Sequence, residues 1–141
     1  MDKIEELEQL RAANKEAREA AEKEQYAKDL EALCKLEEEH ETIASVKVAR
    51  FRKGQPTRAL LRTPDTIEYK RYVDQIGRAV DKKNTNAMRA AQELLANACW
   101  VYPKSPEEKK EMLEAFPGLL TSIALAAAAL AEGKSEEEGK G

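Results

Sequence analysis

The stretch Cys99-Trp100-Val101-Tyr102-Pro103, with Phe116-Pro117-Gly118-Leu119-Leu120 after it, decides how the C-terminal half of this chain folds. Pro103 and Pro117 interrupt an apolar and otherwise helical half, because proline lacks the N–H that a helix interior needs and disfavours helical geometry in the residue before it. The sequence therefore predicts several short helices with aromatic side chains at their corners. Neither segment pairs a nucleophile with a base, so packing rather than catalysis is indicated.

Start and stop signals divide the surrounding sequence into helices. Ser105, Pro106 and Glu108 form a capping-box pattern with proline at the first helical position. Further upstream, Asp65 or Thr66 can cap a helix that begins near Pro64. The expected helices run from about residue 64 to 81, from 84 or 85 to 100, from 106 to 115, and from 118 to near 133.

Apolar side chains recur at helical spacing in three of these helices, and we expect these positions to face the core. They are Ile67, Tyr69, Tyr72, Val73, Ile76 and Val80 in the first helix, Ala87, Ala91, Leu94, Leu95 and Ala98 in the second, and Leu119, Leu120, Ile123, Ala127 and Leu130 in the last.

A β-hairpin is predicted before these helices, over residues 45–62. Two short runs rich in β-branched and apolar residues flank a turn at Lys53-Gly54-Gln55-Pro56. Basic residues within the hairpin could gather on one face and contact phosphates, or could protect the exposed face and edges of a small sheet. These residues are Arg50, Arg52, Arg58 and Arg62.

The N-terminal segment predicts one long helix over residues 2–41, because it has no proline or glycine and consists mostly of strong helix formers. Its larger apolar residues, such as Leu7 and Leu10, give way to alanine in the middle, and the heptad register drifts. A leucine-zipper dimer is therefore not indicated. We expect a solvated helical arm, with a dedicated coiled coil as the alternative.

Composition excludes several function classes. The 141 residues include 36% charged and 5% aromatic residues and one histidine, His40, so the usual zinc ligand sets are out of reach. Cys34 and Cys99 lie in unlike contexts with no CxxC neighbour, which indicates free thiols. Glycine-rich phosphate loops and the common hydrolase motifs are missing. We therefore expect no catalytic residues, no metal, no cofactor and no membrane span, and a function based on binding surfaces.

The predicted fold is mainly α with a small β-hairpin: a long N-terminal helix followed by a compact bundle of short helices. Residues 1–44 form the charged arm, residues 45–133 the hairpin and helical core, and residues 134–141 a disordered charged tail.

The order of these elements over about residues 45–133 resembles the small phage tail assembly chaperones. The residues that carry the resemblance are the basic hairpin, Thr63 to Lys70 with Glu68 and Tyr69, the segment Trp100-Val101-Tyr102-Pro103, and Phe116-Pro117 before the closing Ala/Leu helix. The long acidic helix departs from the compact members of that family.

The resemblance implies a protein that binds the tape-measure protein, and possibly the tail-tube protein, in the cytoplasm of a bacterial host. It keeps the tape-measure protein soluble during tail-tube assembly. We expect partner contacts from Trp100, Tyr102 and Phe116, and from the hairpin residues Arg50, Arg52 and Arg58. Two alternatives stay open. One is an oligomerising virion or scaffold component that uses the N-terminal helix, and the other is a nucleic-acid-binding accessory protein that uses the basic hairpin.

Overall fold

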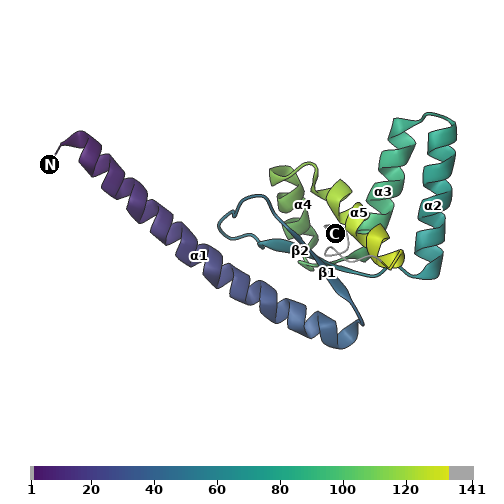
Figure 1. Ribbon diagram of the computed structural model, residues 1–141, viewed down its shortest axis with the longest axis horizontal. Coiled ribbons are helices and arrows are strands. Elements are labelled where there is room, and N and C mark those ends of the chain that lie inside the picture. Colours follow the sequence, from purple (N-terminus) through teal and green to yellow (C-terminus); the bar gives the residue numbers. More distant parts are fainter. Residues whose placement is uncertain (1, 134–141) are drawn as a thin grey trace.

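A computed structural model describes residues 2–133, and the expected tail at residues 134–141 lies outside this range (Figure 1). The described chain is mainly α-helical with a small antiparallel sheet, as the sequence predicts. Its elements are α1 (Lys3–Glu39), β1 (Ile43–Lys47), β2 (Arg58–Arg62), α2 (Thr66–Asp81), α3 (Thr85–Cys99), β3 (Trp100–Tyr102), α4 (Pro106–Ala115) and α5 (Leu119–Ala131).

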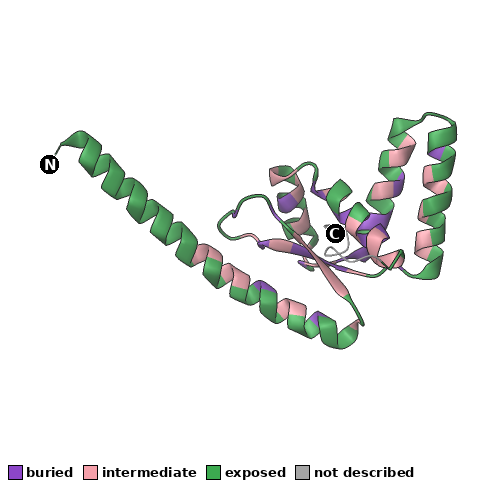
Figure 2. Cartoon of the chain, viewed as in Figure 1, coloured by how far each residue is buried: buried purple, intermediate pink, exposed green. Residues whose placement is uncertain are grey.

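The long helix α1 confirms the predicted helical N-terminal segment. Asp2 caps it, with its carboxylate accepting a hydrogen bond from the backbone N–H of Glu5 at 2.8 Å. Residues 2–20 are all exposed, whereas Asp29 and Leu36 in the second half are buried (Figure 2). The second half of α1 is therefore packed against the rest of the protein, and the solvated arm extends from the N-terminus to about Arg18, whose guanidinium donates to the carbonyl of Phe51 at 2.9 Å.

The hairpin forms, but with a different first strand and a longer loop than expected. β1 pairs antiparallel with β2, from Ile43 opposite Arg62 to Lys47 opposite Arg58. The sheet thus begins before residue 45, the expected start of the core. The ladder stops near Thr57, because its N–H donates to the side chain of Asp29 in α1 instead of to a strand neighbour. Residues 48–57 form a loop held by this long-range contact.

A third strand corrects the sequence interpretation, which continued the preceding helix to Trp100. β3 begins at that residue and pairs antiparallel with β2, with Leu61 opposite Trp100 and Leu60 opposite Tyr102. Trp, Val and Tyr all favour strands. The neighbouring strand β2 then stabilises the extended conformation, and β2 becomes the centre of the sheet.

The core lies between the sheet and the helices α3, α4 and α5. Ala59 and Leu61 of β2 pack there with Leu95, Met112 and Ile123. Leu60 points to the opposite face by strand alternation and is also fully buried. That face is the side on which Arg58 stacks over the ring of Tyr26 in α1, so both faces of β2 are covered.

Helices α2 and α3 form an antiparallel pair that projects from this core (Figure 1). Their caps follow the predicted signals, since Asp65 and Glu68 make a reciprocal capping box and Asn84 caps α3. Four apolar residues that were expected to face the core are instead exposed, because α2 packs mainly on α3, and the core contacts the pair chiefly through α3, which packs on α5. They are Ile67, Val73, Val80 and Leu94.

Candidate functional site

Asp29 forms the main polar junction between α1 and the sheet. Its buried carboxylate accepts hydrogen bonds from the N–H and the hydroxyl of Thr57 at 2.8 and 2.5 Å, from the Tyr102 hydroxyl at 2.6 Å, and from Gln25 at 3.0 Å. Burial, and then the neighbouring Asp29, raise the pKa of Tyr102 above its usual range. Because Thr57 lies in the hairpin loop and Tyr102 in β3, their hydrogen bonds to Asp29 fix the position of α1 against both segments.

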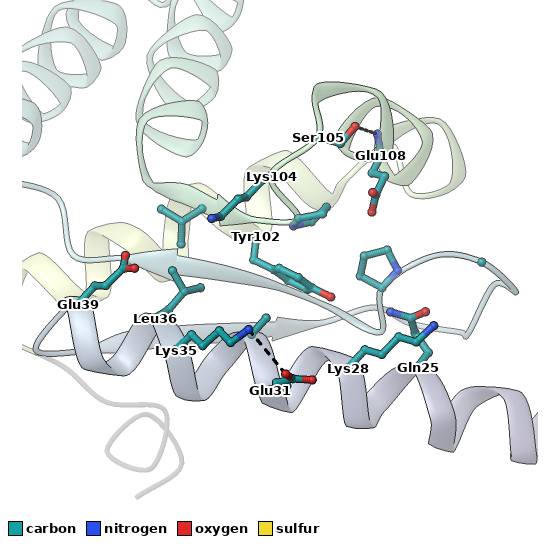
Figure 3. A pocket seen from close by; sticks show the side chains of 15 residues that line it. Gln25, Lys28, Glu31, Lys35, Leu36, Glu39, Tyr102, Lys104, Ser105 and Glu108 are labelled. Carbon is teal, nitrogen blue, oxygen red and sulfur yellow. Dashed lines mark hydrogen bonds and ion pairs between the residues drawn. The ribbon is translucent and has the colours of Figure 1, made fainter.

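The cleft beside this junction, here called the α1 cleft, has a volume of about 810 Å³ and separates α1 from the segment that joins β3 to α4. Figure 3 shows Tyr102 projecting toward α1, with Lys35 and Glu31 of that helix in an exposed ion pair of 3.6 Å. The charged side chains around it are of both signs: Lys28, Glu31, Lys35, Glu39, Lys104 and Glu108. This mixture favours no particular charge in a ligand.

A second hollow, here called the α2–α3 groove, lies between the two helices of the projecting pair. One part of about 430 Å³ is lined by Ala79, Ala87, Ala90, Ala91 and Leu94. An adjoining part of about 410 Å³ runs along α2 and shares Gln75 and Arg78 with the first. The second part is lined by α2 alone, and the apolar floor belongs to the first part, between the two helices.

The rim of the α2–α3 groove is basic. The charged residues that line its two parts are Lys70, Arg71, Asp74, Arg78 and Lys82. Four cations against one carboxylate make the groove suited to an apolar partner with acidic flanks. Leu94 is 49% exposed, which leaves a large apolar side chain accessible there.

The structure places Trp100 in the core, with 2% of its surface exposed. Its indole N–H donates to the carbonyl of Tyr102 at 2.7 Å, and the Lys109 ammonium lies 5.5 Å from its ring centre. Phe116 is half-buried against the core, with the Arg50 guanidinium 5.2 Å from its ring centre. Of the three aromatics, only Tyr102 lines the α1 cleft.

The hairpin arginines contact different elements. Arg58 stacks over Tyr26 at 4.5 Å, and Arg62 donates to both carboxylate oxygens of Glu68 and to the carbonyl of Ala98. Arg52 is exposed in the loop. The structure does not gather these side chains into one basic face.

Sequence reasoning missed the α2–α3 groove because it assigned the apolar stripes of both helices, Ile67 and Leu94 included, to the core. A signal was present: Ile67 and Ile76 are nine residues, or two and a half helical turns, apart, so they lie on opposite sides of α2 and one stripe against α3 could not cover both.

Reactive groups give little support for catalysis in the described part of the chain. Among residues 2–133, no group of three or more His, Cys, Asp or Glu residues is placed to hold a metal ion. Cys34 is exposed and Cys99 is buried, and burial raises the pKa of the Cys99 thiol to about 11, which disfavours the reactive thiolate.

Within the same residues, no single helix is long and apolar enough to cross a membrane. Helices α4 and α5 reach that length and composition only together, with a bend of 111° between them.

Comparison of the chain with protein-family models, with curated proteins and with solved structures finds no match.

Proposed function

We propose that this protein is a phage tail assembly chaperone that holds amphipathic helical segments of the tape-measure protein in the α2–α3 groove. The observation that supports this proposal is an exposed, apolar groove with a basic rim, formed by two packed helices. A helix-binding protein lays the apolar face of its partner into such a groove. The resemblance over residues 45–133 supplies the class of client.

The dimensions of the groove suit a helix of a few turns. α2 has 16 residues and is therefore about 24 Å long, which matches about four turns of a partner helix. Anchors at positions i, i+3 or i+4 and i+7 would lie over Ala87, Ala91 and Leu94, with acidic flanks toward Arg78 and Lys82. Covering a client's apolar face in this way would keep it soluble in the host cytoplasm.

The α1 cleft is the weaker candidate for the client site. It has a larger volume, but its charges are mixed and Tyr102, its central aromatic residue, already donates to Asp29. The nucleic-acid alternative is not favoured either, since Arg58 and Arg62 are engaged within the protein.

Co-expression with the cognate tape-measure protein tests the proposal. The unmodified chain should keep that client in the soluble fraction, and Leu94→Glu should abolish the effect, because a carboxylate on the groove floor would be buried by the client. Leu125→Glu is the matched control, since Leu125 is an exposed leucine on α5, away from the groove.

Two results would count against the proposal. If the unmodified chain leaves the tape-measure protein insoluble, the chaperone function is wrong. If Leu94→Glu protects the client as well as the unmodified chain does, the α2–α3 groove is not the client site.

A further inference from the structure

The first half of α1 presents large apolar side chains that have no partner within residues 2–133. Ile4, Leu7 and Leu10 are 68%, 54% and 57% exposed. They lie within three turns of one another near the N-terminus of the helix, and Figure 2 shows this end standing clear of the body. Apolar residues grouped in this way indicate an interaction surface.

The face that carries Leu7 is the continuation of the face by which α1 contacts the rest of the protein. Eighteen residues make five helical turns, so Leu7 lies on the same side of α1 as Gln25, and Arg11 on the same side as Asp29. Gln25 and Asp29 belong to the junction with Thr57 and Tyr102. The last contact of this face toward the N-terminus is the hydrogen bond from Arg18 to the carbonyl of Phe51, so Leu7 continues the face beyond the rest of the described protein.

Charge complementarity indicates which surface binds this segment. The segment Asp2–Leu10 carries four acidic residues, namely Asp2, Glu5, Glu6 and Glu8, against one lysine. The rim of the α2–α3 groove has the opposite sign, with four cations against Asp74. The protein therefore contains both halves of a complementary pair: an acidic helix with exposed leucines and a basic groove with an apolar floor.

The acidic segment and the basic groove of one chain cannot contact each other. α1 has 37 residues and is about 55 Å long, and its N-terminus and the α2–α3 pair lie at opposite ends of the molecule (Figure 1). Two α1 helices pairing with each other is the less favourable arrangement, because their N-terminal segments have the same charge and the apolar positions that follow Leu10 are alanines.

We propose that the segment Asp2–Leu10 of one copy docks in the α2–α3 groove of a second copy. The interface joins two different surfaces, so each copy offers one segment and one groove, and association continues head to tail into a ring or an open chain. This self-association goes beyond the proposed function and requires no client.

Light scattering coupled to size-exclusion chromatography tests the proposal on the full chain over a range of concentrations. The unmodified protein should form species larger than a monomer. Leu7→Glu and Leu94→Glu should each weaken association by at least about tenfold, because each places a carboxylate in the apolar contact. Leu30→Glu on α1 and Leu125→Glu on α5 are matched exposed-leucine controls and should associate as the unmodified protein does.

A mixture of the two disrupted variants identifies the geometry. Leu7→Glu retains an intact groove, and Leu94→Glu retains an intact N-terminal segment, so together they should form a one-to-one dimer that cannot grow. Circular dichroism should show unchanged helix content in each variant, since both substituted positions are exposed.

The proposal is overturned if the unmodified chain is monomeric at every concentration, or if Leu94→Glu alone still associates, which would indicate pairing of α1 with α1. It is also overturned if the mixture stays monomeric. The segment and the client would occupy the same groove and would therefore compete for it. Because no client is present in this experiment, it measures self-association alone, and Leu7→Glu, which leaves the groove intact, should still protect the client in the co-expression test.

Discussion

Asp29 is the residue on which the position of α1 depends most directly. It is buried, and its carboxylate is the acceptor for Thr57 and for Tyr102, which lie in the hairpin loop and in β3. A buried donor that loses its acceptor keeps its full desolvation cost, so the junction is sensitive to the loss of this one side chain.

Asp29→Ala should lower the free energy of unfolding by about 3 kcal/mol, because it leaves the Thr57 N–H and two hydroxyl groups without their acceptor. Tyr102→Phe, which removes a single hydrogen bond, should cost about 1 kcal/mol. Urea denaturation followed by circular dichroism measures both values. Glu24→Ala, at an exposed position of α1, is the control and should be nearly neutral. An equally small effect of Asp29→Ala would show that the junction does not hold α1.

The ion pair between Arg62 and Glu68 predicts a pH dependence. Two hydrogen bonds of 2.8 Å from the Arg62 guanidinium hold the pKa of Glu68 below its usual value. The folded state therefore binds this proton less tightly than the unfolded state, in which the pKa is about 4.3. The stabilisation is present above that pH and is lost as the pH falls through the lower, folded pKa.

Glu68→Gln should cost about 1–2 kcal/mol at pH 7, because the amide still accepts from the Asp65 N–H but has no charge. The difference from the unmodified protein should narrow below about pH 4, as Glu68 itself becomes protonated. Thermal melts across this pH range provide the measurement, with the exposed Glu111→Gln as control. If the difference in stability between Glu68→Gln and the unmodified protein is constant down to about pH 2, the charge of Glu68 does not contribute to stability.

At the scale of elements, α1 combines two functions within one continuous helix. Residues 2–20 are exposed, whereas the segment from Gln25 to Leu36 contacts the sheet and the hairpin loop. Helix propensity makes the element continuous, and tertiary contacts divide it. Truncation distinguishes the two parts.

Removing residues 1–16 should leave the thermal midpoint of a dilute sample nearly unchanged, since no buried side chain is lost. Removing residues 1–41 should lower the thermal midpoint by about 10 °C or more, because the buried residues Asp29 and Leu36 are lost and one face of the sheet is uncovered. Differential scanning calorimetry compares the two. A core that melts normally without residues 1–41 would mean that α1 contributes no stability.

At the scale of the whole molecule, the charges are divided between an acidic first helix segment and a basic α2–α3 groove, while the formal net charge is only -3. Opposite signs at distant ends favour association between copies over attraction to a uniformly charged polymer. The hairpin arginines do not alter this, since Arg58 and Arg62 are engaged.

We therefore expect no measurable affinity for duplex DNA at about 0.15 M salt, where charges further apart than about 8 Å are largely screened. Fluorescence anisotropy with a labelled duplex, repeated over a salt series, is the measurement. Tight binding with a steep salt dependence would instead favour the nucleic-acid-binding alternative.

Local sequence determined most of the elements of this protein. Helix formers, capping residues and prolines act within a few residues of their own position, so the helices could be predicted with nearly their observed bounds. These signals are the helix formers of residues 3–39, the caps at Asp65, Asn84 and Ser105, and the prolines at 103 and 117. A mainly helical chain with a small sheet follows from these signals alone.

Only the tertiary structure decided which surfaces remain free. Trp100 became a strand residue because β2 lies beside it, and Asp29 became a buried acceptor because a hairpin loop about 28 residues later in the chain folds onto α1. Leu94 was left exposed because α3 packs on α5 through neighbouring residues such as Leu95 and Ala96, while Leu94 lies beside the hollow between α2 and α3. Periodicity shows that a side chain is apolar and on which face it lies, but whether another element covers that face depends on contacts distant in sequence. For that reason the α2–α3 groove, and the point along α1 at which the exposed arm ends, could be located only in the folded chain.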